Sequence, residues 1–332
     1  MRVAILGAAH AHVAYALDEI ARRPELDLVA AAEPDPVMRR RFLSGLDVPI
    51  HQLPSDLLAE HEIDVALVAG VYADRAEAVL AALRAGAHVL ADKPLCTSLD
   101  QLERIEIAAA AADRHVSVVF EKRFSPPTLA LQRMLADGEL GQLALVAATG
   151  PHKLNQASRP DWFLRPRTYG GIAADLPVHD IDLVLRFTGA LSGSVAAITG
   201  NARPFDHPGF DDHVAVLLRA GSVAATLEAN WLGPEASDVH GHYRMRVTGT
   251  EGTAELDWAY NRLFVTTHSR PTREIELGTA ARPAAYFFDA LLDGGEPEIR
   301  TVDSVLATRI ALLAQQSADS DSAPRPWIAP VR

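Results

Sequence analysis

The sequence is poor in cysteine, in long apolar runs and in positive charge. Cys96 is the single cysteine among 332 residues, which excludes an intrachain disulfide and a zinc site built from several cysteines. No apolar run is long enough to span a bilayer, and no signal-peptide pattern precedes the first apolar segment. We therefore expect an unexported, cytoplasmic protein that does not enter a membrane.

Acidic residues outnumber basic ones, 43 against 31, and the formal net charge is −12. Such a chain is a poor candidate for binding nucleic acid, because that requires basic groups to neutralise phosphates. Hydrophobic residues make up 48% of the chain and charged residues 22%, an ordinary globular composition. The length fits two domains or one large α/β unit.

The first third of the chain alternates between short apolar runs and helical patterns. Continuous apolar runs of this kind are typical of strands covered by helices on both sheet faces, so we predict an α/β fold with a doubly wound parallel sheet. The expected strands are residues 2–6, 26–33, 63–70, 88–92 and 115–121. The expected helices are about 11–23, 36–45, 74–86 and a segment after Ser98.

After about residue 121 the pattern changes. A helix at 125–141 and a strand at 143–150 precede a polar segment, and a helix is expected at 171–188. From about residue 194 to 277 strand follows strand with hairpin-like turns, which predicts an α+β half with a mostly antiparallel sheet. Two helices, about 283–293 and 301–317, are expected to close the chain.

The stretch GAAHAH follows the first expected strand, where a dinucleotide-binding protein carries Gly-x-Gly-x-x-Gly. Gly7 is present, Ala9 holds the second glycine's place and His12 the third. An ordinary strand–helix corner is about as plausible on this evidence alone. If the turn does bind a dinucleotide, we predict that His10 or His12 donates to the cofactor phosphates or points toward the nicotinamide.

Glu33 ends the second expected strand, where a dinucleotide fold places an acid that accepts hydrogen bonds from the ribose hydroxyls. A carboxylate there repels a 2′-phosphate and so favours NAD over NADP, whereas an exposed strand-end acid is the plainer interpretation. Arg39, Arg40 and Arg41 weaken the preference if one of them reaches a phosphate. A solvated helix face explains these arginines equally simply.

The stretch Asp92-Lys93-Pro94 ends another expected strand, and Ser98 is a good helix N-cap just beyond it. A lysine at the carboxyl end of a parallel strand lies on the edge where such sheets bind ligands. It could act there as an acid or base, although a surface lysine has about equal weight on position alone.

Asp175, His179 and Asp182 are spaced so that they share one face of the helix expected at 171–188. Histidine is suited to moving a proton near neutral pH, and a nearby carboxylate can orient it. A capped helix with an ordinary ion pair is the alternative. A metal site is disfavoured, because the pattern lacks a second histidine.

Together these segments resemble the Gfo/Idh/MocA oxidoreductases over nearly the whole chain. The motifs that carry the resemblance are the first strand and turn, Glu33, GAHVLADKPLCTS, VVFEKRFSP with LADGELGQL after it, the GG…D…H.ID pattern at 170–182, and LATRIALLAQQSA near the end. The family usually has Glu-Lys-Pro where this sequence has Asp92-Lys93-Pro94.

The resemblance implies a Rossmann domain at 1–121 that binds NAD or NADP. It also implies an α+β domain at 122–332 whose large, open-faced sheet often forms the interface of a homodimer or homotetramer. A sugar, polyol or sugar-derived substrate is expected in the cleft. Lys93, Asp175 and His179 map onto the family's catalytic lysine, aspartate and histidine, the histidine being the usual acid or base. Gly70 and Pro94 complete the expected cofactor contacts.

The sequence also departs from the family pattern. The glycine-rich turn is reduced to Gly7, and residues 70–75 read Gly-Val-Tyr-Ala-Asp-Arg where many members have Thr-Pro-x-x-x-His. Ile172 replaces the third glycine of GGG, and Pro177 stands where a glycine usually precedes the histidine. The catalytic positions are thus kept while the positions that contact the cofactor differ.

The polar segment 151–171 borders the substrate in the family. Its donors, with Arg123 from the preceding motif, predict a polyhydroxylated substrate that bears a carboxylate, and Trp162 would stack on a sugar face or else fill a core. The expected substrate residues outside the catalytic set are Arg123, His152, Lys153, Asn155, Trp162 and Arg165, with Arg159 and Arg167 nearby. A catalytically silent sensor of dinucleotide or sugar is the alternative function, and hydrolysis or elimination with bound NAD is a third.

Overall fold

The apolar runs of the N-terminal part form a six-stranded sheet in the computed structural model, which describes residues 1–203 and 207–330. All strand pairs are parallel, in the order β3-β2-β1-β4-β5-β6. This is the Rossmann order, in which the chain reverses direction beside the central β1, so the predicted doubly wound sheet is confirmed. The strands are β1 (Arg2–Ala8), β2 (Asp27–Ala32), β3 (Ile50–His51), β4 (Val65–Ala69), β5 (His88–Ala91) and β6 (Val116–Val118).

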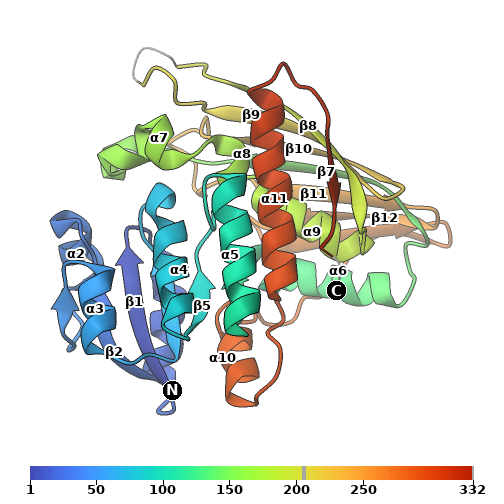
Figure 1. Cartoon of the computed structure of the whole chain (residues 1–332). Coiled ribbons are helices and arrows are strands. Elements are labelled where there is room, and N and C mark those ends of the chain that lie inside the picture. Colours follow the sequence, from blue (N-terminus) through green and yellow to red (C-terminus); the bar gives the residue numbers. More distant parts are fainter. Residues whose placement is uncertain (204–206, 331–332) are drawn as a thin grey trace. The chain divides into compact units, whose positions relative to one another are not determined.

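Helices pack on this sheet through an apolar core (Figure 1). Val13 and Ala16 of the first helix join Phe287 and Phe288 of a helix near the chain end in the cluster against β1 and β4. Ser98 caps its helix as predicted, because its side chain accepts the N–H of Gln101. The helices are α1 (Val13–Arg22), α2 (Pro36–Leu43), α3 (Pro54–Glu60), the 3-10 helix η1 (Tyr72–Asp74), α4 (Arg75–Arg84), α5 (Leu99–Ala112) and α10 (Ala285–Leu292).

The strand β3 and the helix α3 were not predicted from the sequence. The strand has only two residues, so it leaves no periodic apolar signal. Pro54 stands at the first position of α3, which buries only Leu57. Such a short helix with one buried side chain carries too little pattern for recognition.

The C-terminal part forms a nine-stranded sheet of order β14-β13-β12-β11-β7-β10-β9-β8-β15. The pair β7–β10 is parallel and the other pairs are antiparallel, which confirms the predicted mostly antiparallel sheet. The strands are β7 (Leu143–Pro151), β8 (Ser192–Gly200), β9 (His213–Ala220), β10 (Val223–Asn230), β11 (Arg244–Gly249), β12 (Gly252–Asp257), β13 (Arg262–Thr267), β14 (Arg270–Glu274) and β15 (Arg325–Ile328).

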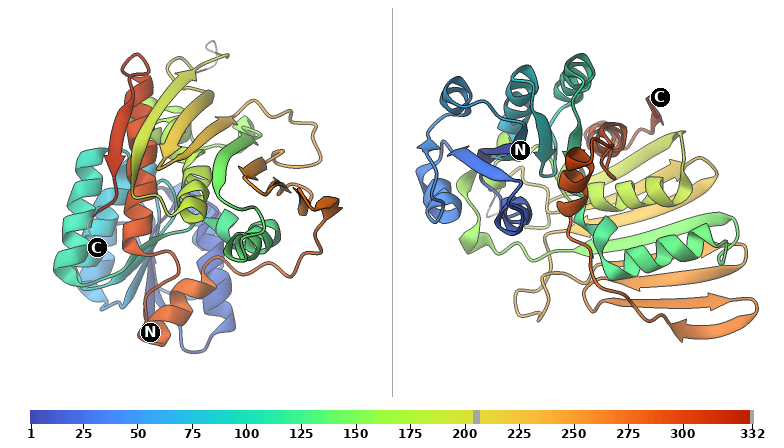
Figure 2. Two further views of the ribbon diagram at one scale, coloured as in Figure 1. Left: turned by 90° about the vertical axis from the view of Figure 1, so that its right-hand side faces the viewer. Right: turned by 90° about the horizontal axis from the view of Figure 1, so that it is seen from below.

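Two helices cover one face of this sheet (Figure 2). Helix α9 (Val178–Thr188) packs on β7, β9 and β10, and α6 (Pro126–Ala136) packs on β12 and β13. The remaining helical segments are η2 (Glu121–Phe124), η3 (Gln156–Ser158), η4 (Asp161–Leu164), α7 (Pro166–Tyr169), α8 (Ile172–Asp175) and α11 (Thr301–Ala318).

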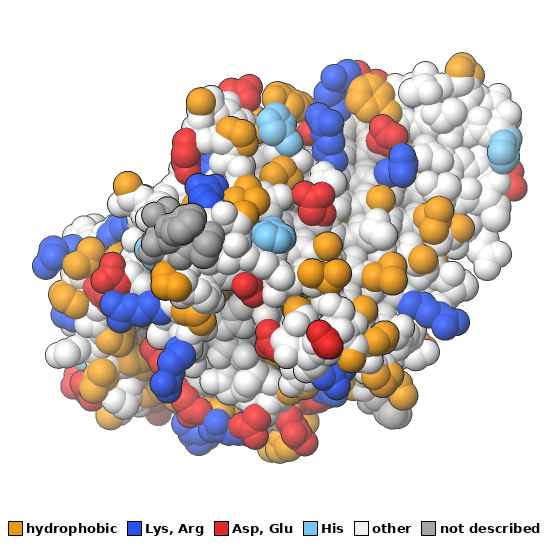
Figure 3. All heavy atoms as spheres, turned by 90° about the horizontal axis from the view of Figure 1, so that it is seen from above, with side chains coloured by type: hydrophobic (Ala, Val, Ile, Leu, Met, Phe, Trp, Pro, Cys, Tyr) orange, Lys and Arg blue, Asp and Glu red, His pale blue; other side chains and the backbone are white. Residues whose placement is uncertain are grey.

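The opposite face of the nine-stranded sheet carries no helix among the residues that the structure describes. Figure 3 views this face and shows hydrophobic side chains spread along it. Leu145, Ile198 and Leu217 are between 56 and 62% exposed there, although their strands β7, β8 and β9 are all internal to the sheet. A shallow depression of about 490 Å³ follows the same strands.

The chain divides into two compact units that follow the two sheets. The first unit comprises residues 1–119, 167–170 and 282–308, and the second comprises 120–166, 171–281 and 309–332. Residues 204–206 and 331–332 belong to the C-terminal domain expected at 122–332 but lie outside the described residues. Within the described ranges, we find no helix that combines the length and the apolar character needed to cross a membrane.

Candidate active site

The turn after β1 lies directly against the end of β4. Gly7 has a φ of +97°, and a Cβ added to it would stand 2.7 Å from the Cα of Gly70. The backbone N–H groups of Ala9 and His10 both donate to the carbonyl of Ala69, at 2.8 and 3.1 Å. The glycine that the sequence keeps is therefore the one that this backbone conformation and close approach require.

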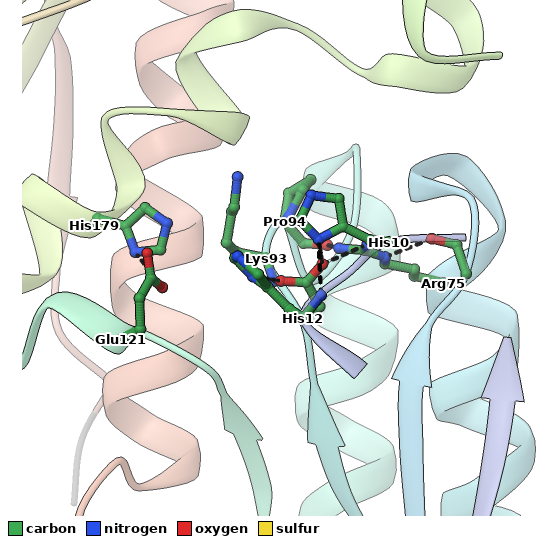
Figure 4. A network of polar contacts seen from close by, with 9 residues as sticks. His10, His12, Arg75, Lys93, Pro94, Glu121 and His179 are labelled. Atoms are coloured by element: carbon green, nitrogen blue, oxygen red, sulfur yellow. Dashed lines mark hydrogen bonds and ion pairs between the residues drawn. The ribbon is translucent and has the colours of Figure 1, made fainter. Parts of the chain in front are cut away.

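Asp92 receives four hydrogen-bond donors just after β5 (Figure 4). One carboxylate oxygen lies 2.7 Å from Nδ1 of His12 and 2.8 Å from the backbone nitrogen of Lys93. The other oxygen lies 2.9 Å from Nδ1 of His10 and 2.9 Å from Nη2 of Arg75. We call these five residues the Asp92 cluster. Lys93 extends its side chain away from the carboxylate in Figure 4.

Arg75 ties two further turns to this cluster. Its side chain is fully buried, Nε donates to the carbonyl of Gly70 at 2.8 Å, and Nη1 donates to the carbonyl of Pro94 at 3.0 Å. The guanidinium also lies 4.4 Å from the ring centroid of Tyr72. The turns after β1, β4 and β5 are thus joined at the carboxyl edge of the sheet, where Rossmann proteins bind ligands.

At neutral pH the cluster holds an ionised Asp92 and a neutral His10. Burial alone would raise the pKa of Asp92, but attraction by His10, His12 and Arg75 outweighs it and holds that pKa well below the usual value. Burial lowers the pKa of His10 to about 4, against the opposing attraction of Asp92. The buried guanidinium of Arg75 places a positive charge directly against the Asp92 carboxylate.

Sequence reasoning placed His10, His12 and Lys93 correctly on one sheet edge but did not foresee what joins them. Both histidines direct Nδ1 to Asp92. That one of them donates to the cofactor phosphates or points toward the nicotinamide stays a prediction. Asp92 and Arg75 were not among the expected site residues. The sequence offered only an arginine near the start of an expected helix and an aspartate at the end of an expected strand. No local pattern indicated that these two residues, 17 positions apart, are in contact.

Glu33 stands just beyond β2, as the sequence predicted, and it is buried. Its Oε2 accepts the N–H of Ala8 at 2.6 Å and its Oε1 accepts the N–H of Asp35 at 2.9 Å. Burial raises the pKa of Glu33 despite these two backbone donors. Arg39 donates from Nε to the backbone carbonyl of Glu33 at 2.9 Å, so at least one of the three arginines lies at this strand end.

His179 lies in the first turn of α9, in the second unit, and is 4% exposed. The Oε2 of Glu121 is 3.4 Å from its Nδ1 (Figure 4), and the Phe120 ring meets the imidazole edge-on at 6.1 Å. At this distance the two groups interact electrostatically without the geometry of a hydrogen bond, and the carboxylate stabilises a protonated imidazole. Sequence reasoning did not identify Glu121 as this partner.

The contact between Glu121 and His179 is one of three between η2 and α9. Each of three consecutive residues of η2 pairs with an acidic or basic side chain of the helix. The pairs are Glu121–His179 at 3.4 Å, Lys122–Asp180 at 2.6 Å, and Arg123–Asp182 at 2.7 and 2.6 Å. We call them the pair row. Arg123 was expected near the substrate, but its bidentate contact with the buried Asp182 favours a role in holding α9.

The single helix predicted at 171–188 is wrong. The structure has α8, which ends at Asp175, and α9, which starts at Val178. Pro177 lies between them and interrupts the hydrogen-bond ladder because it lacks a backbone N–H, although Leu176 and Pro177 keep helical dihedral angles. Asp175, His179 and Asp182 therefore do not share one continuous helix face, and Asp182 pairs with Arg123. Asp175 is fully buried at the end of α8.

The segment after β7 gathers aromatic and histidine side chains. The Nδ1 of His152 lies 2.7 Å from the carbonyl oxygen of Gly150, and its ring lies 4.5 Å from Tyr243 and 5.2 Å from Trp231, between centroids. The guanidinium of Arg159 lies 4.8 Å from the Trp231 ring. Trp231 directly follows β10 and Tyr243 directly precedes β11, both more than 75 residues away, so the sequence pattern around His152 did not reveal them.

The other residues expected near a substrate differ in exposure. Lys153 donates from Nζ to the carbonyl of Ser237, so its ammonium is engaged by the backbone. Asn155 and Arg165 are exposed, and Arg165 lies 3.5 Å from Asp161. Trp162 is half-buried beside Phe163, with ring centroids 5.6 Å apart.

These two sites fit a known class of protein. A Rossmann sheet with polar groups at the carboxyl ends of its central strands defines a dinucleotide-binding protein. Residues 1–120 match the model of an oxidoreductase family with an NAD-binding Rossmann fold. Residues 128–255 match the model of the GFO/IDH/MocA C-terminal domain. The chain therefore belongs to the Gfo/Idh/MocA family of oxidoreductases.

Curated relatives share about a quarter of their residues with this chain. The uncharacterized oxidoreductase YrbE of Bacillus subtilis is 27% identical, over 91% of this chain and 89% of its own length. The trans-1,2-dihydrobenzene-1,2-diol dehydrogenase of Macaca fuscata fuscata is 27% identical, over 70% and 67%. The scyllo-inositol 2-dehydrogenase (NAD⁺) of B. subtilis is 24% identical, over 76% and 72%.

Solved structures share the fold along almost the whole chain. A Thermotoga maritima protein has a TM-score of 0.91 with 24% identity, and the match covers 98% of this chain and all of the other. A levoglucosan dehydrogenase in complex with NADH has a TM-score of 0.83 with 19% identity, covering 98% of both chains. At these identities the likeness establishes the fold alone.

Proposed function

We propose that the chain is an NAD-dependent dehydrogenase that oxidises a CH–OH group of a sugar, polyol or sugar-acid derivative. The observation that carries this proposal is the buried imidazole of His179, 3.4 Å from the carboxylate of Glu121, because such a histidine can take up a proton next to a negative charge. Oxidation of an alcohol requires such a group, because the hydroxyl proton must leave while hydride departs from carbon. Lys93 is the second proposed catalytic residue, and Asp175 the third.

The first unit has the features that a dinucleotide needs. The tight turn at Gly7, the small side chain of Ala9 and the buried carboxylate of Glu33 lie at the carboxyl ends of β1 and β2. When bound, a nicotinamide supplies the hydride acceptor. We propose residues 1–121 as the domain that binds it, with Gly70 and Pro94 beside it, and 122–332 as the domain that binds substrate.

Each catalytic residue has a distinct task in this proposal. His179 takes the hydroxyl proton, and the nearby Glu121 carboxylate stabilises the imidazolium that forms. The Lys93 ammonium stabilises the negative charge that develops on the substrate oxygen. Asp175 helps to position the substrate and the histidine. The proposed substrate residues are His152, Lys153, Asn155, Trp162 and Arg165, of which Asn155 and Arg165 have the most exposed polar groups.

Glu33 supports NAD rather than NADP as the cofactor. Its carboxylate lies where the adenosine ribose binds in Rossmann proteins, and a 2′-phosphate would meet negative charge there. Arg39 is partly committed to the carbonyls of Glu33 and Pro34, at 2.9 and 3.1 Å. We therefore expect Glu33→Ala to raise the KM for NAD and to reduce the preference for NAD over NADP.

The uncovered face of the nine-stranded sheet supports a homodimer or homotetramer. Leu145, Ile198 and Leu217 on the middle strands are more than half exposed. An apolar sheet face of this kind is unusual on a monomer and typical of an interface. Sedimentation of the purified chain tests this, and Leu217→Arg should shift the mass toward the monomer.

A panel assay of reduced-nicotinamide absorbance tests the function. The panel contains scyllo-inositol, levoglucosan and trans-1,2-dihydrobenzene-1,2-diol, which the names of the relatives and of the solved structure give. It adds myo-inositol and sugar acids to cover the proposed polyol and sugar-acid substrates. We expect turnover with at least one of them and a loss of about 100-fold or more in kcat for Lys93→Met and His179→Asn. His115→Asn is the matched control, because His115 directly precedes β6 and so lies at the amino end of a strand in the same sheet. Tight NADH binding without turnover would indicate a sensor instead.

A further inference from the structure

Three of the places where this chain departs from its family pattern meet at one point in the first unit. His12 holds the place of the third glycine, Asp92 replaces the usual glutamate, and Arg75 holds the sixth place of the altered 70–75 stretch. All three belong to the Asp92 cluster. Because these three residues contact one another, we interpret them as one joint change of the site and not as three unrelated substitutions.

The distances define which atom of His12 carries the proton. Its Nδ1 is 2.7 Å from an oxygen of Asp92, a normal hydrogen-bond distance, and a carboxylate that is ionised can only accept. The proton of a neutral His12 therefore lies on Nδ1. The same oxygen accepts the backbone N–H of Lys93 at 2.8 Å, so the histidine and the lysine backbone are held by one atom.

A metal ion is the main alternative for two histidines and a carboxylate. The three groups lie close enough together to be considered as ligands. However, the guanidinium of Arg75 is 2.9 Å from the second oxygen of Asp92 and would repel a cation. The separations of 2.7 and 2.9 Å between nitrogen and oxygen are also those of direct hydrogen bonds.

We propose that His12, assisted by His10, is a positioning residue that acts on the reaction through Asp92 by holding the backbone of Lys93. This deepens the proposed function and rests on it, because it assumes that Lys93 serves the reaction. Both histidines sit on the turn that faces the dinucleotide in Rossmann proteins. The arrangement thus connects the turn that binds cofactor with the strand end that carries the catalytic lysine.

Two amide substitutions at position 12 separate the proposed role from a direct contact with a ligand. Asn places an amide N–H close to the position of Nδ1–H, so His12→Asn keeps the donor to Asp92. Gln places its amide near Nε2, so His12→Gln loses that donor but retains a polar group toward a ligand. His12→Ala removes both, and His115→Asn controls for the loss of a histidine elsewhere in the same unit.

The lysine content of the chain provides a readout that needs no substrate. Lys93, Lys122 and Lys153 are the three lysines, so protein grown with lysine labelled with carbon-13 at Cε gives three assignable signals. We expect His12→Ala and His12→Gln to shift the Lys93 signal and leave the other two unchanged. His12→Asn should keep the Lys93 signal near its wild-type position. NADH affinity, measured by fluorescence, should change less than about threefold in all variants.

Three results would overturn this inference. One is a Lys93 signal that does not move in His12→Ala. Another is rescue by Gln and not by Asn, which would assign the role to Nε2. The third is a loss of NADH affinity of about tenfold or more with an unmoved Lys93 signal, which would make His12 a cofactor contact.

A double-mutant cycle distinguishes failure of this inference from failure of the proposed function. With the substrate found in the panel, His12→Ala should lower kcat about tenfold or more in the wild type. It should have little further effect in Lys93→Met, because the two residues act through one group. Full additivity would contradict the positioning role. Wild-type turnover by Lys93→Met would instead remove the catalytic role of Lys93 from the proposed function.

Discussion

The Asp92 cluster and the pair row compensate charged side chains in different ways. In the first unit, four donors from three turns converge on one carboxylate. In the second unit, three adjacent residues of η2 each pair with a different side chain of α9. A convergent arrangement depends on its central group, whereas each contact of a row can be lost separately. The comparison therefore predicts different responses to single substitutions.

The largest expected effect is that of Asp92→Asn. An amide has only one oxygen to accept from four donors, and its N–H₂ group would face the buried guanidinium of Arg75. We expect the free energy of unfolding in urea to fall by about 5 kcal/mol, the upper range for breaking a buried ion pair. The exposed Asp47→Asn should leave it within about 0.5 kcal/mol. Equal effects of the two variants would show that Asp92 is not central to its cluster.

Arg123→Met should have the next largest effect. It removes the bidentate partner of Asp182, which is 1% exposed, so we expect a loss of about 3 to 4 kcal/mol in unfolding free energy. The double variant Arg123→Met/Asp182→Leu should recover most of this loss, since it removes both charges. A double variant as unstable as the sum of the single ones would show that Arg123 and Asp182 do not stabilise the fold through their contact.

The stability of the first unit should depend on pH through His10. Its pKa is about 4 in the folded chain against an ordinary value of 6.5, so between these values the unfolded chain binds more protons. The free energy of unfolding therefore rises with pH across this window and is lost as the pH falls through it, by up to about 3 kcal/mol. His10→Asn should flatten this slope in urea titrations at successive pH values. An unchanged slope would assign the dependence to another group, such as His88, whose pKa burial also lowers to about 4.

The smallest effect is expected for an exposed ion pair outside both arrangements. Arg262 and Glu274 lie 2.8 Å apart on neighbouring strands, and both side chains are about half exposed. Arg262→Met should leave the free energy of unfolding in urea within the error of the measurement, because solvent screens such pairs. A loss as large as that of Arg123→Met would contradict the expectation that burial gives the pairs of the two arrangements their larger effects.

Local patterns in the sequence predicted the elements that position both sites. Continuous apolar runs marked the parallel strands, Ser98 marked a helix start, and Gly7 marked a tight turn. These features depend on neighbours in the chain, so the sequence displays them directly. The two-residue strand β3 escaped recognition, because two residues carry no period.

The contacts within the sites could not be predicted in the same way. His12 meets Asp92 across 80 positions, and Arg123 meets Asp182 across 59. Spacing suggested that His179 would share a helix face with Asp175, but Pro177 interrupts the helix and Glu121 provides the nearby carboxylate. Residue types indicated the chemistry, whereas the partners depend on tertiary packing that no local pattern encodes.

The central claim is that this chain transfers hydride from a CH–OH carbon to a nicotinamide. The most direct measurement uses the panel substrate with the highest rate, deuterated at its carbinol carbons, and locates the label by mass spectrometry and NMR of the product cofactor. We predict one deuterium at C4 of the reduced nicotinamide for the wild type, and none above background for His179→Asn over the same time. Product formation with the label retained in the sugar or released to water would contradict hydride transfer to the cofactor.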